Sequence, residues 1–321
     1  MIRILGCDKE TVREFELGSL EDARQLPVIW VDVAKPTEDE LRLLQEKFQL
    51  HPLAIEDALH RGQRPKAEDY EEHLFTVLHT LRSQNGKVVW DEIFIFTGER
   101  WLITIHEKDP QITDIFDKVL RPGKARPLTQ ATDALYQSIV DRVVDGYFTV
   151  LDSVEDQIDD LESEVAQNPT KEALRRMDEI RKNLITVRRS VWPTREMVGS
   201  IMKGIFPIVS DQNIAYFRNI YDHVAQLMDL IEAYHARMSG IGELYVESLT
   251  ASTSEAVRVF TILATIFLPP TLIASIYGMN FGGIPEFRWG PDGSYGYIFA
   301  LILMGVVTIA PLAYLRARKL L

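Results

Sequence analysis

The sequence predicts a membrane protein with an N-terminal cytosolic α/β domain, a long helical stalk and two C-terminal transmembrane helices. Three observations predict this fold class. Short β-branched or aromatic runs mix with a helical pattern over residues 1–130, and helical periodicity then dominates from residue 131 to Pro269. Two uncharged apolar runs, each long enough to cross a bilayer, lie near the end of the chain.

Strand-like segments define the first domain, residues 1–130. The runs rich in β-branched and aromatic residues are Ile2–Leu5, Val28–Val33, Leu74–Leu81, Val88–Phe96 and Trp101–His106. Asn85-Gly86 lies between two of them and predicts a hairpin turn. Thr37 and Glu40 have capping-box spacing, so we expect a helix to begin at Thr37.

Residues 131–206 predict a pair of cytosolic helices joined by a turn at Asn168-Pro169-Thr170. The first helix ends in a run of carboxylates between Asp152 and Glu164, and the second is basic. This charge pattern favours an antiparallel hairpin with attractive faces, although exposed ion pairs contribute at most about 1 kcal/mol each. The acidic helix could also concentrate cations, and the two interpretations are compatible.

The segment 207–258 predicts a long stalk helix. Its apolar and small residues step by three and four, as in a helix that packs along copies of itself or its neighbours. The seam comprises Ile214, Phe217, Tyr221, Val224, Met228, Ile231, His235, Met238, Gly242, Tyr245 and Leu249. No strong breaker precedes Pro269-Pro270, so one helix of about 100 Å is expected from Asp211 to Tyr277.

The predicted membrane spans are residues 259–279 and 295–314, joined by a loop at 280–294 and followed by a basic tail at 315–321. Two apolar segments of about 20 residues, so closely joined, indicate a transmembrane hairpin in the lipid bilayer. Arg316, Arg318 and Lys319 follow the second span, whereas the loop carries only Arg288. The positive-inside rule therefore places both termini in the cytoplasm of a cell whose plasma or inner membrane holds the protein.

Small hydroxyl residues gather on one face of the first span. On a wheel of 100° per residue, that face holds Ser254, Thr261, Thr265, Thr271 and Ser275. Hydroxyls on one face suit a water-filled axis that carries a hydrated ion. A seam of small residues between packed helices gives the same pattern, and the wheel alone does not separate the two.

Composition narrows the function classes. The net charge of −12 argues against nucleic acid as a partner, and Cys7 is the only cysteine, so no disulfide framework is predicted. No glycine-rich phosphate loop and no nucleophile–base arrangement is visible. We therefore expect neither an enzyme nor an organic cofactor. His73, His79 and His106 have no metal-ligand spacing and are interpreted as structural.

The first span ends in Tyr277-Gly278-Met279-Asn280, and this triplet after a proline-containing span resembles the signature of the CorA family of divalent-cation channels. The resemblance extends along the whole chain through HPLAIEDALHRGQRPKAEDYEEHLF, YFRNIYDH and PEFRW. It implies a homopentameric funnel whose first span lines the pore and whose selectivity filter is Gly278, Met279 and Asn280. Five Asn280 amide oxygens would face a hydrated cation, and Gly278 would allow a backbone geometry that other residues resist.

Further pore positions follow from the same resemblance. Thr271 matches a polar ring below the filter, while Leu268 and Phe260 match hydrophobic constrictions that gate by dewetting. Ser254 stands where some members have Asn, and Glu286 matches an acidic residue of the external loop.

The resemblance also implies a cytosolic Mg²⁺ control site between subunits. Asn219 occupies the position where some relatives carry an aspartate, and the position of its partner falls near Gln84 or Asn85. Neutral amides bind a dication weakly. Asp222 and His223 lie one turn away and remain candidate ligands.

The favoured function is a homopentamer that conducts hydrated Mg²⁺, with Co²⁺ or Ni²⁺ as further cargo, and uses cytosolic Mg²⁺ or another divalent cation for gating. Two alternatives stay open. One is a zinc transporter of the same superfamily, although the predicted path offers no Cys, His or carboxylate for zinc. The other is a membrane-tethered cytosolic scaffold without transport.

Overall fold

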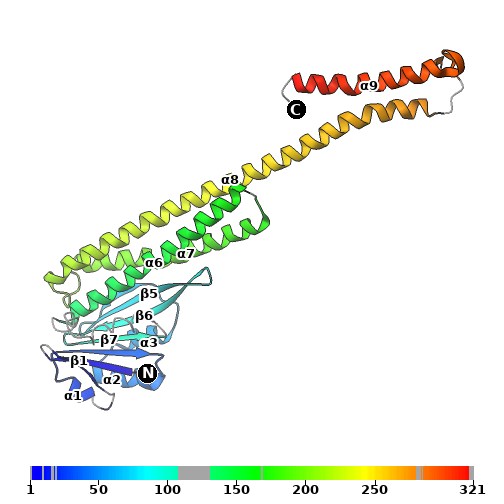
Figure 1. Ribbon diagram of the computed structural model, residues 1–321. Coiled ribbons are helices and arrows are strands. Elements are labelled where there is room, and N and C mark those ends of the chain that lie inside the picture. The colour runs from blue at the N-terminus through cyan, green and yellow to red at the C-terminus, as the bar shows by residue number, and fades with distance from the viewer. Residues whose placement is uncertain are drawn as a thin grey trace. The chain divides into compact units, whose positions relative to one another are not determined.

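The computed structural model describes residues 2–8, 11–15, 18, 20–107, 131–167, 169–279, 283 and 285–317 (Figure 1). The chain divides into two compact units, Met1–Gly242 and Glu243–Leu321. The first contains all the described strands, and the second contains the two apolar helical segments.

The N-terminal unit is built on a seven-stranded sheet of order β2-β1-β3-β7-β6-β5-β4. Only the β3–β7 pair is parallel, and all the others are antiparallel. The strands are β1 Ile2–Asp8, β2 Thr11–Phe15, β3 Val28–Ala34, β4 Lys66–Asp69, β5 Leu74–Gln84, β6 Lys87–Thr97 and β7 Trp101–His106. The five predicted strands are present. The two that sequence patterning missed, β2 and β4, are the short edge strands.

Helices α1 (Leu20–Ala23), α2 (Glu38–Phe48) and α3 (Pro52–Leu59) lie on one face of this sheet (Figure 1). Leu41, Leu44 and Phe48 of α2 pack with Phe75 and Phe96 of the sheet in the main apolar core. The predicted capping box is confirmed. The Thr37 hydroxyl accepts from the Glu40 amide at 3.2 Å, and the Glu40 carboxylate accepts from the Thr37 amide at 2.9 Å.

The predicted hairpin turn joins β5 and β6. Asn85 and Gly86 have φ angles of 51° and 76°, the left-handed geometry that a two-residue hairpin turn requires and that Asn and Gly tolerate best. Asn183 in the helical layer accepts from the Val88 amide at 2.9 Å and donates to the Gly86 carbonyl at 2.8 Å. Its side chain therefore ties the hairpin to the helices.

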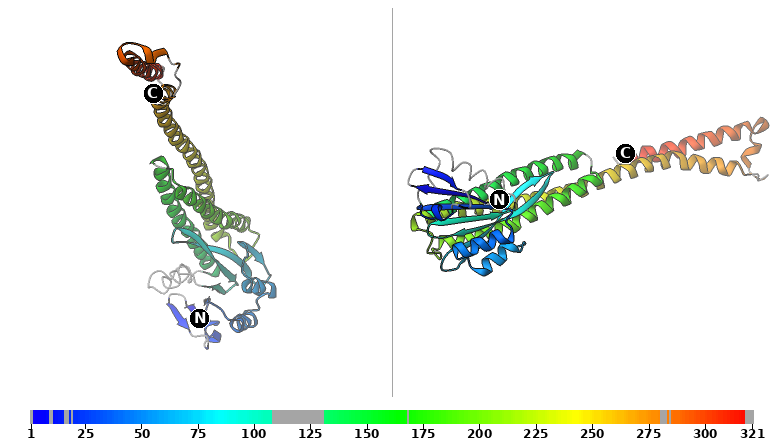
Figure 2. Two further views of the ribbon diagram at one scale, coloured as in Figure 1. Left: turned by 90° about the vertical axis from the view of Figure 1, so that its right-hand side faces the viewer. Right: turned by 90° about the horizontal axis from the view of Figure 1, so that it is seen from below.

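Helices α6 (Thr132–Gln167) and α7 (Lys171–Met202) contact the opposite face of the sheet (Figure 2). The start of α8 (Asp211–Tyr277) packs against α6, where the Tyr136 and Phe217 rings meet at 5.6 Å. Two buried tyrosines of α6 anchor it to β5. Tyr136 shares a hydrogen bond with Thr76 at 2.9 Å, and Tyr147 donates to the His79 carbonyl at 2.5 Å. The sheet is therefore sandwiched between two helical layers.

The acidic end of α6 forms ion pairs with other residues than the predicted α6–α7 hairpin would give. In the described part of the chain, one ion pair, Arg176–Glu164, links α6 to α7. Arg237 of α8 instead holds the acidic end of α6, at 2.6 Å from Asp159 and 2.7 Å from Glu162. Most arginines of α7 are exposed to solvent, and a run of charges in the sequence does not show which of them will be.

The apolar seam of α8 is filled largely within one chain. Five seam residues are buried inside the single chain: Phe217, Val224, Met228, Ile231 and Met238. This agrees with the predicted packing of the seam along neighbouring helices. After Gly242 the seam positions Tyr245 and Leu249 are half-buried and exposed. Most of the first half of the seam therefore serves the fold of the chain itself, and the exposed Leu249 in the second half is available for contacts with copies.

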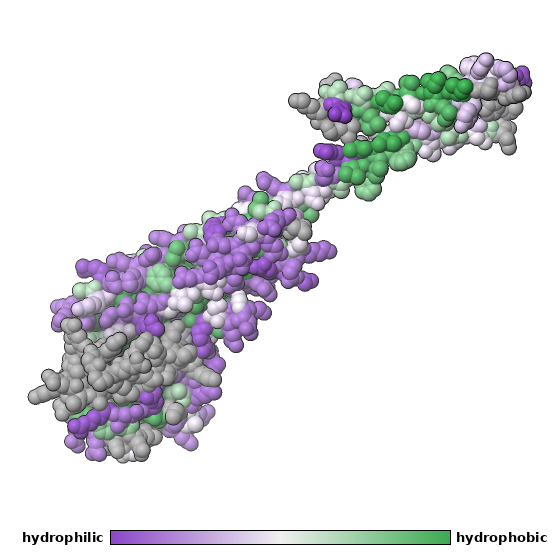
Figure 3. Space-filling model, in the orientation of Figure 1, coloured by the Kyte–Doolittle hydropathy of each residue, from purple (hydrophilic) through white to green (hydrophobic). Residues whose placement is uncertain are grey.

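The C-terminal unit contains the end of α8 and helix α9 (Ser294–Ala317), which runs back beside it (Figure 1). Both helices pass a length and hydropathy criterion for membrane spans. Their surface is largely apolar (Figure 3), and Phe260, Leu268 and Tyr297 are each at least 66% exposed. Two 3-10 turns, η2 (Pro285–Arg288) and η3 (Pro291–Gly293), precede α9.

Buried His73 predicts acid sensitivity of the N-terminal unit. Its ring is 2% exposed among aromatic neighbours, neither nitrogen has a hydrogen-bond partner, and burial lowers its pKa to about 4. The unfolded chain takes up this proton near pH 6.5, so stability falls as the pH drops from about 6.5 to 4. Relative to wild type, His73→Phe should remove up to about 3 kcal/mol of this loss, measured as the free energy of unfolding in denaturant. His60→Phe, on an exposed residue, should not, and equal pH profiles for all three proteins would contradict the prediction.

Candidate functional site

Three threonines of the apolar part of α8 use their hydroxyl hydrogens on the helix itself. Thr261, Thr265 and Thr271 donate to the carbonyls of Val257, Thr261 and Phe267, at 2.8, 2.8 and 2.6 Å. Each hydroxyl oxygen is thereby left with lone pairs that point away from the backbone. Water molecules around a cation point their hydrogens outward, so such oxygens suit a hydrated ion.

Two prolines inside α8 add backbone acceptors on the same stretch. Pro269 and Pro270 have no amide hydrogen, so the carbonyls of Thr265 and Ile266 lack the usual donor four residues later. In a membrane such groups need a partner, which a water-lined path supplies. The remaining predicted path residues, Ser254 and Ser275, are exposed.

The predicted constrictions, Phe260 and Leu268, are 71% and 66% exposed in the single chain. Apolar side chains of this size do not stay in contact with water without cost, at roughly 25 cal/mol per Å². Lipid or further subunits would therefore cover them.

Helix α8 ends at the predicted filter. The Gly278 amide donates to the Ala274 carbonyl at 2.8 Å, and the Met279 amide donates to Ile276 at 3.2 Å. The φ angle of Gly278 is not in the positive range. The position is tight instead, because a Cβ there would lie 3.1 Å from the Ala274 carbonyl oxygen. Asn280 lies outside the described residues.

The external-loop candidate, Glu286, lies in η2 against the start of α9. Its carbonyl accepts from the Trp289 amide at 3.2 Å, and a Cβ on Gly296 would come within 2.1 Å of the same oxygen. The Trp289 and Phe299 rings meet edge to face at 5.4 Å. Gly296 therefore permits the close approach that positions Glu286.

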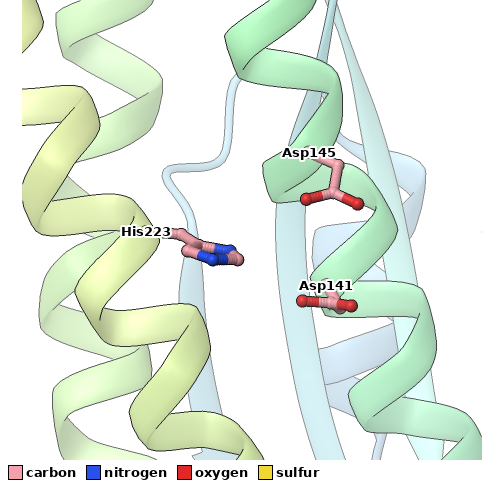
Figure 4. A group of neighbouring side chains, drawn as sticks. All are labelled: Asp141, Asp145 and His223. Carbon is pink, nitrogen blue, oxygen red and sulfur yellow. The ribbon is translucent and has the colours of Figure 1, made fainter.

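In the N-terminal unit the predicted control residues lie mostly at the surface of the single chain. Asn219 and Asp222 are exposed, as are Gln84 and Asn85 of the hairpin, whereas His223 is half-buried. His223 instead faces two aspartates of α6, Asp141 and Asp145, which sequence analysis missed (Figure 4). Ligand atoms of these three side chains all lie within 4.8 Å of one another.

We call Asp141, Asp145 and His223 the His–Asp cluster. The surroundings of this cluster shift the pKa of one of its carboxyl groups. Burial raises the pKa of Asp141 above its ordinary value, the neighbouring Asp145 charge adds to that effect, and His223 opposes it. The Nδ1 atom of His223 is buried and has no hydrogen-bond partner. The only sequence signal for the pair was the spacing of four residues between the aspartates, which places them on one helix face.

The comparisons with known proteins agree on one family. Residues 27–318 match the family described as CorA-like Mg²⁺ transporter protein. The cobalt/magnesium transport protein CorA of Thermotoga maritima is 33% identical over 330 residues, which cover 99% of this chain and 92% of the relative. The cobalt/magnesium transport protein CorA of Methanocaldococcus jannaschii is 22% identical over 311 residues, 96% of each chain.

A solved structure gives the same result for the fold. The complete structure of the CorA magnesium transporter from Methanocaldococcus jannaschii matches with a TM-score of 0.85 at 20% identity, over 98% of this chain and 97% of the other. At that identity the match establishes the α/β unit, the long helix and the apolar helices as a shared architecture. The match over residues 27–318 and this shared architecture show that the chain belongs to the family of CorA-like Mg²⁺ transporter proteins.

Proposed function

We propose that five copies of this chain form a membrane channel that passes hydrated Mg²⁺ into the cytoplasm, with Co²⁺ and Ni²⁺ as further cargo. The family and the name of the Thermotoga relative support a divalent cation as the cargo. The chain-specific support is the combination on α8 of aligned hydroxyl oxygens, two donor-free carbonyls and a C-terminal Gly278-Met279-Asn280.

The single observation that carries the proposal is the row of threonine oxygens on α8. Their hydrogens are engaged by the backbone, so the row presents acceptors without presenting negative charge. A carboxylate in a narrow path would bind a bare dication tightly and slow its release. Neutral acceptors instead suit Mg²⁺ that keeps its water shell, because this ion gives up its waters reluctantly.

An oligomer is required for such a path. Two helices cannot enclose water on their own, so several copies of α8 must surround an axis. The exposed seam after Gly242 supplies a surface for that contact. We expect a mass in detergent near five times the 36.7 kDa of one chain. A monomer that still transports would contradict this part of the proposal.

The direction of flow follows from charge. With both termini in the cytoplasm, a potential of about 100 mV, negative inside, favours entry of a dication by about 4.6 kcal/mol. No phosphate-binding loop is visible for coupling to ATP. A cytosolic divalent cation that stabilises the closed state would then limit uptake as the internal concentration rises.

The test is ion flux in liposomes with the purified full-length protein. Mg²⁺ influx under an inside-negative potential, with no need for a proton gradient, is the expected result. Influx of Zn²⁺ that needs a proton gradient, without Mg²⁺ influx, would favour the zinc transporter. Absence of flux for every ion, in vesicles shown to contain the assembled protein, would favour the scaffold.

A further inference from the structure

We infer that the N-terminal unit binds a nucleoside polyphosphate, of the ATP or ADP type, in a cavity between the sheet and α7. The cavity has a volume of about 640 Å³, within the range of about 300–1,000 Å³ that is typical of small-molecule sites. Arginines and tryptophans are prominent in its lining: Arg64, Arg188, Arg189, Trp90 and Trp192. We call it the Trp–Arg cavity. Binding there does not depend on the proposed channel function and implies no hydrolysis.

The lining of the Trp–Arg cavity is positively charged in an acidic protein. Three arginines and, within the described residues, no aspartate or glutamate line it, although the whole chain has a net charge of −12. Arg64 and Arg189 are exposed, and neither forms an ion pair with a described residue. Guanidinium groups bind phosphate oxygens through paired hydrogen bonds, and like charges held close together gain from an anion between them. The lining therefore favours an anion with several phosphate groups.

Two indole rings give the cavity flat apolar walls. Trp90 and Trp192 are 41% and 44% exposed, and each ring is held by a neighbour. The His79 ring stacks on Trp90 with centroids 4.4 Å apart, and the Trp192 Nε1 donates to the Glu196 carboxylate at 3.2 Å. The Arg188 guanidinium lies 5.8 Å from the centroid of the Trp192 ring. Because every nucleobase stacks on an aromatic ring, this pairing of ring and positive charge suits a base that carries phosphates.

Buried hydrogen bonds fix the loop that carries Arg64. The Glu92 carboxylate accepts from the amides of Gly62 and Gln63, at 3.0 and 2.6 Å. From the other side, the Nε2 atom of His79 donates to the Gln63 carbonyl at 2.8 Å. The same histidine therefore supports both the loop and the indole wall. A site whose parts are already held in place loses little conformational entropy when a ligand binds.

A proline in α7 adds an acceptor for the base or the sugar. Pro193 has no amide hydrogen, so the carbonyl of Arg189 lacks its usual donor four residues later. The amino group of a base, or a ribose hydroxyl, can donate to this carbonyl, whereas a fully ionised inorganic polyphosphate has no hydrogen to donate. This carbonyl and the two indole walls therefore favour a nucleotide over inorganic polyphosphate.

The lining also selects the metal-free form of the nucleotide. Mg²⁺ on a nucleotide is usually held by a protein carboxylate as well as by the phosphates, and the described lining offers none. Bound Mg²⁺ also cancels two of the negative charges that the arginines attract. If the proposed channel function is correct, the cavity would fill as cytosolic Mg²⁺ falls, because less of the nucleotide then carries the ion.

The test is equilibrium dialysis of radiolabelled ATP against the full-length protein in detergent, with a chelator present. Wild type should bind one ATP per chain, and excess Mg²⁺ should weaken that binding. Unlabelled tripolyphosphate and adenosine should each displace ATP at least about tenfold less effectively than unlabelled ATP does, because each supplies only part of the ligand. Absence of ATP binding at millimolar concentration, or equal displacement by ATP and tripolyphosphate, would overturn the inference.

Single substitutions separate the two halves of the site. Arg64→Gln and Arg189→Gln should each weaken the binding of both ATP and tripolyphosphate at least about tenfold, because each removes a charge-assisted hydrogen bond. Trp90→Leu should weaken ATP to a similar extent but leave tripolyphosphate binding unchanged, which also shows that this variant is folded. Arg181→Gln, on an exposed residue of α7 outside the cavity, should bind as wild type. Equal losses in Arg64→Gln and Arg181→Gln would reduce the effect to net charge and overturn the inference, whether or not the protein conducts ions.

Discussion

Asn280→Ala should abolish selective Mg²⁺ uptake, lowering flux at least about tenfold, which corresponds to about 1.4 kcal/mol or more in the barrier. In the proposed pentamer, five Asn280 amide oxygens accept hydrogen bonds from the water shell of the entering ion. Alanine removes all five acceptors at once. Folding and assembly should persist, because Asn280 follows the end of α8 at Tyr277 and alanine removes no apolar side chain there. Flux into liposomes is the measurement.

Three further measurements isolate the filter. Asn213→Ala, at the N-terminal end of α8, should conduct as wild type. Hexaamminecobalt(III), which mimics a hydrated ion and does not shed its ligands readily, should block wild type and spare Asn280→Ala. Asn280→Asp should slow flux despite stronger binding, because five neighbouring carboxylates hold a proton or a cation tightly. Normal Mg²⁺ flux in Asn280→Ala, insensitive to the mimic, would exclude a filter at Asn280.

Local rules predicted most of the secondary structure. Thr37 with Glu40 predicted the start of α2, and Asn85-Gly86 predicted the β5–β6 turn, because both signals act within four residues of sequence. The length of α8 followed from the absence of breakers. The edge strand β4 was missed because its sequence, Lys66–Asp69, is mostly charged, and its pairing with β5 depends on a distant strand.

The candidate sites likewise differ in whether their residues are close together or far apart in the sequence. The hydroxyl row on α8 was predictable because all its members belong to one helix of known period. The His–Asp cluster was not, because His223 and Asp141 are 82 positions apart and only the packing of α6 against α8 brings them together. Asp222, the neighbour that seemed equally suitable in sequence, is exposed on another face of α8. Long-range contacts of this kind leave no periodic signal.

Leu268→Gly should raise Mg²⁺ leak under conditions that close the wild-type channel. In the proposed pentamer, five Leu268 side chains would form a narrow apolar neck that expels water, and a hydrated ion does not enter a dry neck. Glycine widens the neck and exposes backbone, so water and ions persist there. Phe260→Gly should act in the same direction at the second constriction. The measurement is flux into liposomes at a Mg²⁺ concentration, on the side of the N-terminal unit, that silences wild type.

Glycine in a helix interior also destabilises the helix by about 1 kcal/mol, and Leu268 lies next to Pro269 and Pro270, where the helix already lacks backbone donors. A matched control for this loss of helix stability is therefore needed. Leu263→Gly provides it, because Leu263 lies five positions earlier on the same helix, about 140° around from Leu268. This control loses the same side chain and the same helix propensity, yet should not leak. Leu268→Ser, which keeps a side chain but makes the neck polar, should leak as glycine does. If the Leu268 and Leu263 variants leak equally, the increase in leak comes from helix disruption. If neither variant leaks, Leu268 faces lipid or a packing partner. In that case the register proposed for the pore face of α8 is wrong.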